Sequence, residues 1–419
     1  MKSKTVFAGL LSVSMLLGVL SLSDSFAAKP DVGSDSVYLI KNHNPVLKDL
    51  YGVRHNFPIG FTTVLNDHQV LGLTKAGFEV ESVPVYQTTP RCSPMPTCKQ
   101  GGGDGGDDGG TPETRTFLPL DQVPWGIERV YDDTLASTTG GENVRVAVLD
   151  SGVNKDHLDL QVVQCKDFTK GKRIKNTCTD DFGHGTHVAG TIAGNGGTDV
   201  KGIFGVSPDV QLLAYRVCGG SGSCFTDDIA AAIDYAGDTN LGNADIVSMS
   251  LGGDSPSTLI KNAINRNPDL LIIAAAGNDG HLDGNGSIDY PGAFAQVVAV
   301  AATDKSDKIA YFSSISVTST NLNDGIIQEG EVELAAPGVG VESTCTGSLD
   351  GSTSDEDGST NTYCIISGTS MATPHVTGIA AQVWKGDAQT TRNYLHTIAQ
   401  DIASDGFDKY SGFGIPIIP

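Results

Sequence analysis

The chain has 419 residues, 39% of them hydrophobic and 18% charged, with a formal net charge of -22 at pH 7. This length exceeds the usual size of one domain, so we expect one large domain with smaller appendages. Nucleic-acid binding depends on clustered Lys and Arg, and a chain with 27 basic and 49 acidic residues is not expected to show it.

The first 27 residues have the pattern of an export signal. Lys2 and Lys4 precede an apolar run from Val6 to about Leu22, and a cleavage site of small residues ends at Ala27. A membrane anchor is the alternative, but the run is short for a spanning helix and is interrupted by serines. We therefore expect a secreted, extracellular protein that loses residues 1–27 and has no membrane association afterwards.

The cysteines fit an oxidising destination, because disulfides persist there. Eight cysteines allow 105 pairings, and short separations favour pairing in sequence order. A zinc site is the alternative, but no pair shows the two-residue spacing of zinc knuckles and no histidine cluster accompanies the cysteines. The expected pairs are Cys92 with Cys98, Cys165 with Cys178, Cys218 with Cys224 and Cys345 with Cys364.

Two segments precede the main domain. Residues 28–87 contain strand-like runs at Ser36–Ile40 and Phe78–Tyr86. Residues 88–115 include a run of Gly and Asp with almost no side chain to bury, which we interpret as a linker. We therefore expect a small α+β segment, a linker, and a main domain at 116–419.

In the main domain, apolar runs alternate with helix-like segments. Short, nearly continuous apolar runs suit strands that are buried on both faces of a parallel sheet. The predicted fold class is α/β, with an open, mostly parallel sheet and helices on both faces. The expected strands are Val144–Leu149, Val210–Val217, Ile246–Ser250, Leu270–Ala276 and Val297–Ala302, and the expected helices are Thr186–Ala193, Asp227–Tyr235 and Ser257–Asn265.

Two residues at the start of this domain suit proton transfer. Asp150 closes the first strand, at the carboxyl edge where such sheets bind ligands, although a turn role is the alternative. His184 lies in a glycine-rich stretch, three residues before His187. Two histidines could hold a metal, but the HExxH zinc motif needs a different spacing and a glutamate. We therefore favour a general base at His184.

Two further residues suit the other parts of acyl transfer. Ser370 stands at the glycine-flanked entry to an apolar helix, Val376–Trp384. A helix N-cap is the alternative, since a nucleophilic serine needs an adjacent base. Asn278 follows a buried strand and can donate its amide to a developing negative charge, although a structural turn is the alternative. Taken singly, each residue has a structural explanation.

Taken together, these residues form a pattern. Asp150, His184, Asn278 and Ser370 occur in this order, each on a glycine-bearing loop. Over roughly Val123–Gly414 the chain resembles the subtilisin-like serine proteases, or subtilases, whose triad order differs from that of chymotrypsin-like and α/β-hydrolase enzymes. The resemblance implies that Ser370 attacks the scissile carbonyl, His184 moves its proton and Asp150 orients His184. It also implies that Asn278 and the Ser370 N–H bind the oxyanion.

The resemblance further implies an extended polypeptide substrate that is cut internally. Val247–Gly253 matches the family strand that pairs with substrate, and the loop Gly219–Ser223 matches the opposite edge. Asp289 corresponds to the rear of the specificity pocket, with Asp279 near its rim, and indicates basic P1 side chains; a surface turn is the alternative. The expected substrate contacts are Ser250, Leu251, Gly252, Gly220, Ser221, Gly222, Asp289 and Asp279.

Calcium is the structural cofactor that the resemblance implies. Asp159 matches a family ligand, and the loop Asn195–Gly202 corresponds to one that binds calcium through carbonyl and side-chain oxygens. Asp199 and Asp121 are the other expected ligands by alignment.

Residues 28–87 have the size and position of the family's propeptide, which acts as folding chaperone and intramolecular inhibitor. Maturation would cut within the linker, where Arg91, Lys99 and Arg115 are the candidate sites if basic P1 residues are preferred. We expect a monomer that acts on protein and peptide substrates.

Two other classes of protein are the alternatives. A non-catalytic binding protein with this fold would have a broken triad, whereas all the catalytic positions are intact here. A serine esterase or lipase would show a Gly-x-Ser-x-Gly elbow in the order serine, aspartate, histidine, and that order does not accompany Ser370.

Overall fold

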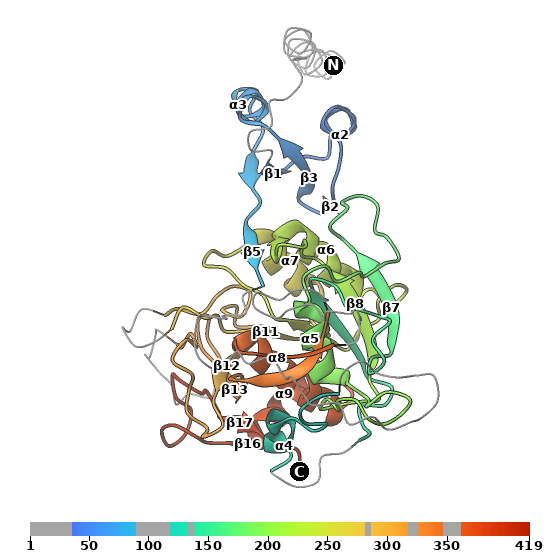
Figure 1. Cartoon of the computed structure of the whole chain (residues 1–419). Coiled ribbons are helices and arrows are strands. Elements are labelled where there is room, and N and C mark those ends of the chain that lie inside the picture. Colours follow the sequence, from blue (N-terminus) through green and yellow to red (C-terminus); the bar gives the residue numbers. More distant parts are fainter. Residues whose placement is uncertain (1–35, 89–117, 133–137, 281–285, 317–325, 347–361) are drawn as a thin grey trace, which may run out of the picture. The chain divides into compact units, whose positions relative to one another are not determined.

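The computed structural model describes residues 36–88, 118–132, 138–280, 286–316, 326–346 and 362–419 (Figure 1). The predicted export signal, most of the linker and the three candidate processing sites lie outside the described residues. The chain divides into two compact units, residues 1–83 and 84–419. We describe each unit by itself.

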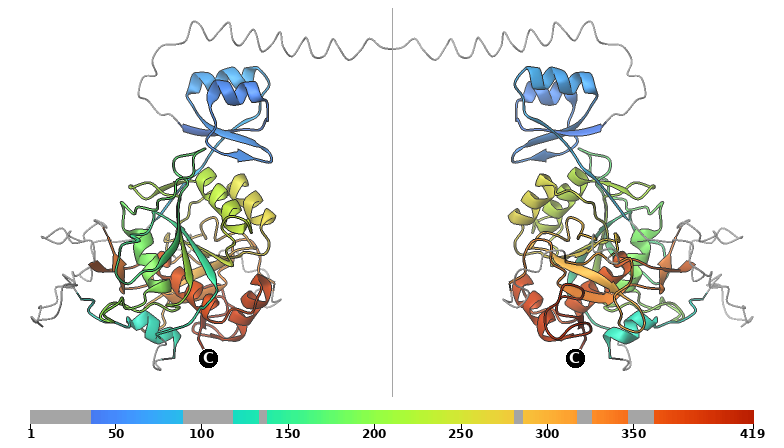
Figure 2. Two further views of the ribbon diagram at one scale, coloured as in Figure 1. Left: turned by 90° about the vertical axis from the view of Figure 1, so that its right-hand side faces the viewer. Right: turned by 90° about the vertical axis from the view of Figure 1, so that its left-hand side faces the viewer.

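The first unit is a small α+β structure. Its four-stranded antiparallel sheet has the order β2-β3-β1-β4, and two helices lie on one side of it (Figure 2). Apolar side chains from both layers form a core around Phe61 and Leu65. Asn66 and Gln69 form a reciprocal capping box at the start of the second helix. The elements are β1 (Ser36–Ile40), α2 (Pro45–Tyr51), β2 (Asn56–Phe57), β3 (Gly60–Leu65), α3 (Asp67–Lys75) and β4 (Val80–Ser82).

The second unit is built on a seven-stranded parallel sheet with the order β13-β12-β11-β10-β6-β8-β7. The central strands are buried apolar runs, as a sheet covered on both faces requires. The predicted α/β fold class and the five predicted strands are confirmed. The strands are β6 (Arg145–Asp150), β7 (Val162–Asp167), β8 (Gln211–Arg216), β10 (Ile246–Met249), β11 (Leu271–Ala275), β12 (Val298–Thr303) and β13 (Leu334–Pro337).

Helices surround this sheet in two packed pairs (Figure 1). One pair is α5 with α8 and the other is α6 with α7, while α4 and α9 lie near the carboxyl terminus of the chain. The three predicted helices are confirmed. The helices are α4 (Trp125–Val130), α5 (His184–Ala193), α6 (Thr226–Gly237), α7 (Thr258–Arg266), α8 (Thr369–Gln382) and α9 (Ala388–Thr397).

The helix α8 begins earlier than the sequence predicts. We expected it to start at Val376, after Pro374, but it runs from Thr369 through the proline. Pro374 has no N–H to donate to the carbonyl of Ser370, four residues before it. The hydroxyl of Ser250 donates to that carbonyl instead, at 2.8 Å. The proline is therefore tolerated because a neighbouring loop supplies the missing donor.

Short antiparallel pairs complete the second unit. They join β5 (Val85–Gln87) to β9 (Ser223–Phe225), β14 (Val341–Cys345) to β15 (Thr362–Ile366), and β16 (Ala399–Gln400) to β17 (Ile415–Pro416). Among the described helices, none has both the length and the apolar character needed to cross a membrane.

Three of the four predicted disulfides are present. They are Cys165–Cys178, Cys218–Cys224 and Cys345–Cys364. The fourth predicted disulfide joins Cys92 and Cys98. The structure does not test it, because Cys92 and Cys98 both lie outside the described residues. The pairing of Cys98 with Cys92 therefore stays a prediction from the short separation of the two cysteines in the sequence.

Candidate active site

Asp150 and His184 meet at the carboxyl edge of the parallel sheet. Asp150 ends β6 and His184 begins α5, and His184 Nδ1 lies 2.8 Å from Asp150 Oδ1. Both side chains are buried, with exposed fractions of 1% and 0%. The second ring nitrogen, Nε2, has no hydrogen-bond partner among the described residues. The carboxylate can therefore orient the ring while Nε2 stays available to accept a proton.

The second histidine of the motif belongs to the core. His187 Nε2 lies 3.1 Å from the carbonyl oxygen of Val341 and 3.2 Å from that of Cys364. Burial, and then the neighbouring His184, lower the pKa of His187 to about 3. Among the described residues, no group suited to a metal contains both histidines. The metal alternative is thus not supported by the geometry.

Ser370 occupies the first turn of α8. Its hydroxyl donates to the carbonyl of Ser250 at 3.2 Å, and its own carbonyl accepts from the Ser250 hydroxyl. Ser250 follows β10, which lies next to β6 in the sheet. The first turn of α8 therefore contacts the loop after the strand next to β6, and the Ser370 hydroxyl bonds to Ser250 and not to His184 Nε2.

Asn278 lies after β11, between that strand and the start of α8. Its Oδ1 accepts from Thr369 N at 3.0 Å and from Thr369 Oγ1 at 3.1 Å. Thr369 Oγ1 also accepts from Gly277 N at 3.2 Å. These bonds hold the carboxamide of Asn278 against the residue that precedes Ser370.

A buried aspartate that the sequence analysis did not select supports this edge. Asp180 is 7% exposed and accepts hydrogen bonds from the hydroxyls of Ser151 and Thr186, at 2.8 and 2.6 Å. Ser151 and Thr186 lie beside Asp150 and His184 in the sequence. The only sequence feature that could have indicated Asp180 is its position four residues before His184.

A segment of the chain itself lies along the predicted substrate edges. The strand β5 pairs with β9, and Gln87 exchanges two backbone hydrogen bonds with Gly252, at 2.9 and 3.0 Å. Thr88 N donates to the carbonyl of Gly222 at 2.9 Å. Gly222 and Gly252, two of the expected substrate contacts, thus both bind an extended segment of the chain itself. We expected substrate contacts in the loop Gly219–Ser223. The pairing with β5 extends beyond this loop to Ser223–Phe225.

Tyr86 is buried beside this pairing. It is 1% exposed, and its hydroxyl donates to the carbonyl of Ser255 at 2.7 Å. A Cβ placed on Gly253 would come within 2.7 Å of the Tyr86 ring, so glycine is needed there to admit the aromatic side chain. This site accommodates a large amphipathic residue of an extended chain.

The predicted acidic residues form a cluster that includes one further member. Carboxylate oxygens of Asp254, Asp279 and Asp289 lie within 4.8 Å of one another. Asp289 sits between two strand ends, since a Cβ on Gly252 or Gly277 would come within 3 Å of its side chain. Burial, and then the charges of Asp279 and Asp254, raise the pKa of Asp289 to about 7.

The three expected calcium ligands make hydrogen bonds with backbone N–H groups. Asp159 is buried and its Oδ2 accepts from Ile203 N at 2.9 Å and from the Tyr363 hydroxyl at 2.6 Å. Asp121 and Asp199 accept from Val123 N and Lys201 N, each two residues further along the chain.

Gln122, which the sequence analysis did not select, contacts the loop Asn195–Gly202. Its Nε2 lies 2.9 Å from the carbonyl oxygen of Val200 and 3.4 Å from that of Gly202. Carboxamide oxygen and nitrogen exchange places by a half turn, so Gln122 can also present its oxygen to the same point.

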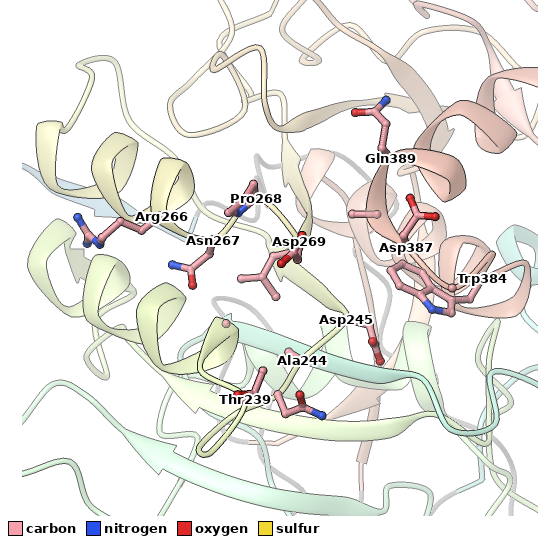
Figure 3. Close-up of a pocket in the computed structure, with 15 residues that line it drawn as sticks. Thr239, Ala244, Asp245, Arg266, Asn267, Pro268, Asp269, Trp384, Asp387 and Gln389 are labelled. Atoms are coloured by element: carbon pink, nitrogen blue, oxygen red, sulfur yellow. The ribbon is translucent and has the colours of Figure 1, made fainter.

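A cavity of about 430 Å³ lies elsewhere in the second unit (Figure 3). Figure 3 shows Asp245, Asp269, Trp384 and Asp387 around it. Asp245 precedes β10, so the cavity is at the amino ends of the strands, whereas Asp150 is at a carboxyl end. This cavity is therefore separate from the candidate active site.

The fold and this site define a class, serine hydrolases that carry a triad in the order aspartate, histidine, serine on a parallel α/β sheet. A profile of the subtilase family matches residues 141–414. The chain is 39% identical to a subtilisin of Bacillus sp. (strain TA39) over 399 residues, covering 88% of this chain and 87% of that protein. It is 36% identical to subtilisin DY of Bacillus licheniformis over 300 residues, covering 70% and 96%.

Solved structures agree with these relatives. Sphericase has a TM-score of 0.65 and 44% identity, covering 72% of this chain and 100% of its own. The S41 psychrophilic protease has a TM-score of 0.64 and 43% identity, with the same coverage. The chain therefore belongs to the subtilase family and is a serine endopeptidase, as the sequence motifs predict.

Proposed function

We propose that this protein is a secreted endopeptidase that cleaves proteins through an acyl-enzyme on Ser370. His184 Nε2 takes the proton of the Ser370 hydroxyl as the oxygen attacks, and returns it to the leaving amine. Asp150 holds the ring and stabilises its cation. The observation that carries the proposal is the buried 2.8 Å contact between Asp150 and His184, with Nε2 directed away from the carboxylate.

Asn278 and the Ser370 N–H would stabilise the oxyanion. The bonds from Thr369 fix the oxygen end of the Asn278 carboxamide, and its NH₂ end is a hydrogen-bond donor of the kind that an oxyanion requires. A fixed donor of this kind stabilises a charge that exists only in the transition state.

The substrate is an extended polypeptide held by strand addition between Ser223–Phe225 and Gly252. The pairing of β5 with both edges supports this mode of binding. The acidic cluster of Asp254, Asp279 and Asp289 favours a basic side chain at P1. Proteins with exposed Lys or Arg are thus the substrate class.

Residues 28–87 would act as a propeptide and intramolecular inhibitor, and residues 1–27 as an export signal. The match to the Bacillus sp. subtilisin covers 88% of this chain, a larger share than the second unit alone, which supports a common amino-terminal extension. The occupation of the substrate edges by β5 supports an inhibitory role for the end of this segment.

Calcium would bind at the loop Asn195–Gly202. The carbonyls of Val200 and Gly202, the carboxamide of Gln122 and the carboxylate of Asp159 provide the oxygen donors that calcium prefers. The ion, when bound, would tie this loop to the start of the second unit and so stabilise the fold.

The test is to express the full chain as wild type and as Ser370→Ala, and to measure casein hydrolysis and the amino-terminal sequence of each product. Loss of hydrolysis and of processing together in Ser370→Ala, with both retained in the exposed control Ser306→Ala, is the expected result. Equal hydrolysis by wild type and Ser370→Ala would overturn the proposal. Labelling by a fluorophosphonate in wild type alone would identify the nucleophile independently.

A further inference from the structure

Asp180 is a buried carboxylate that no catalytic step uses. Its Oδ1 accepts from Gly183 N at 2.7 Å, from the Ser151 hydroxyl at 2.8 Å and from Phe182 N at 3.2 Å. Its Oδ2 accepts from Thr186 N at 2.9 Å and from the Thr186 hydroxyl at 2.6 Å. Burying a carboxylate is costly unless donors surround it, and here donors from two separate loops do so.

These donors connect Asp180 to both members of the aspartate-histidine pair. Ser151 N donates to Asp150 Oδ1 at 2.7 Å, and this is the oxygen that His184 Nδ1 contacts. The Ser151 hydroxyl accepts from Gly185 N at 3.0 Å while it donates to Asp180. The Ser151 hydroxyl therefore joins Asp180 to the residue after His184.

Asp180 also replaces a missing helix cap. The helix α5 starts at His184, and its N-cap residue is Gly183, with φ of 95° and no side chain to accept a hydrogen bond. The first N–H groups of a helix have no partner within the helix. Asp180 accepts hydrogen bonds from two N–H groups at this helix start, those of Gly183 and Thr186. His184 is thus the first residue of the helix that Asp180 caps.

We propose that Asp180 is a positioning residue, which holds the loop after Asp150 and the start of α5 in the mutual geometry that proton transfer requires. This inference rests on the proposed roles of Asp150 and His184. Small errors in such geometry have large effects on rate, about 10²-fold for a displacement of 1 Å. The peptide-binding edges at Gly222 and Gly252 lie on other segments, so the effect of Asp180 on KM should be smaller than its effect on kcat.

The test is to measure kcat and KM of mature Asp180→Asn on a peptide substrate, well below its melting temperature. In this variant an NH₂ group faces N–H donors in place of a carboxylate oxygen, so kcat should fall by about 10- to 100-fold while KM stays within about 2-fold of wild type. Ser151→Ala removes the hydroxyl that bonds to Asp180 and to Gly185, and introduces no new charge. It should also lower kcat, by a smaller factor than Asp180→Asn. Asp156→Asn, at a side chain that is 74% exposed, is the matched control and should keep the wild-type kcat.

A wild-type kcat in Asp180→Asn, with only a lower melting temperature, would mean that Asp180 is purely structural and would overturn the inference. If Asp180→Asn does not fold, Ser151→Ala decides, and an unchanged kcat there overturns it equally. His184→Ala separates this result from the proposed function. Full activity in His184→Ala would refute the triad itself, whereas an inactive His184→Ala beside a fully active Asp180→Asn would refute only the role of Asp180.

Discussion

At the scale of single residues, Asn278 is held by its oxygen end while its amide end is proposed to stabilise the oxyanion. Replacing Asn278 by Ala should lower kcat by about 10²- to 10³-fold with little change in KM, because the donor acts only in the transition state. Steady-state kinetics on a peptide substrate measure both constants. Asn265→Ala, at an exposed helix position, is the control and should match wild type. An unchanged kcat in Asn278→Ala would exclude this residue from the oxyanion site.

The buried carboxyl group of Asp289 leads us to expect that the P1 preference depends on pH. Burial, together with Asp279 and Asp254, raises the pKa of Asp289 to about 7, so its carboxyl is neutral below that pH and charged above it. The preference for Arg over Leu at P1 should therefore rise as the pH increases from about 6 to about 8. The ratio of kcat/KM for two matched peptides at each pH measures this preference. A ratio with the same pH profile in wild type and Asp289→Asn would contradict the assignment.

Residues whose function appears as a contiguous motif could be predicted from the sequence, and residues that act through contacts could not. Asp150, His184 and Ser370 are each embedded in glycine-rich motifs with a recognisable order. Asp180 is close to His184 in sequence, but its link to Ser151 joins segments that are 29 residues apart. No periodicity or spacing in the sequence indicates that hydrogen bond.

At the scale of elements, the disulfide Cys218–Cys224 closes the loop that leads to β9, and both cysteines are fully buried. Without it, the loop must be ordered when substrate binds, which costs roughly 1 kcal/mol or about 5-fold in KM. The Cys218→Ser/Cys224→Ser double variant should therefore show a higher KM for an extended peptide with a smaller change in kcat.

The control for this prediction is the Cys345→Ser/Cys364→Ser double variant. Its disulfide joins β14 to β15, which form a two-stranded sheet separate from that of β5 and β9. It should show a lower melting temperature and an unchanged KM. A higher KM in both double variants would indicate general loosening of the fold and not a specific effect on β9.

The loop Asn195–Gly202 makes a prediction about calcium. Removal of calcium by EGTA should lower the melting temperature, because an ion that binds only the folded state contributes about 2.7 kcal/mol at 100 times its Kd. Thermal unfolding with and without added calcium measures the difference. Gln122→Ala should reduce this difference, whereas Asp199→Asn, which bonds within its own turn, should reduce it less. An equal calcium effect in wild type and Gln122→Ala would exclude Gln122 as a ligand.

Element types could be predicted from local patterns, but one boundary could not. Buried apolar runs indicate the strands β6, β8, β10, β11 and β12, because burial on both faces leaves few polar positions. The start of α8 depends on whether a donor replaces the missing N–H of Pro374. That donor is Ser250, which is 120 residues away in sequence.

At the scale of the whole molecule, a buried ion pair attaches the carboxyl-terminal helix α9 to the sheet. Glu333 is fully buried before β13, and its carboxylate contacts Arg392 at 2.5 Å and His396 at 2.6 Å. The His396 ring stacks on Phe413, with ring centroids 4.0 Å apart. Glu333→Gln should lower the free energy of unfolding by about 3 kcal/mol, because it leaves a cation near the core without its partner.

The same pair has a defined pH dependence. Burial favours a higher pKa for Glu333, but Arg392 and His396 outweigh it and hold the pKa below its usual 4.5. A carboxyl whose folded-state pKa is depressed contributes stability that is present above about pH 4.5 and is lost as the pH falls through the lower, folded-state pKa. Urea unfolding from neutral to acidic pH measures the loss of stability in Glu333→Gln and its dependence on pH.

Glu329→Gln is the matched control for Glu333→Gln. Glu329 pairs with Lys261 at 3.2 Å, and both side chains are more than 40% exposed. An exposed pair of this kind contributes about 0 to 1 kcal/mol. Equal losses in the two variants would show that burial of Glu333 does not set the strength of its interaction.

The sequence by itself determined the α/β class and the catalytic motifs, and it favoured the three described cysteine pairs, because each depends on neighbouring residues or on a short separation. Tertiary structure alone decided which polar and charged side chains that are distant in the sequence come into contact. It brought Asp254 to Asp279 and Asp289, Glu333 to Arg392 and His396, and Gln122 to the loop Asn195–Gly202. It also joined Asp180 to Ser151. These contacts depend on the order of strands in the sheet and on how loops cross its edges, which local sequence patterns do not specify.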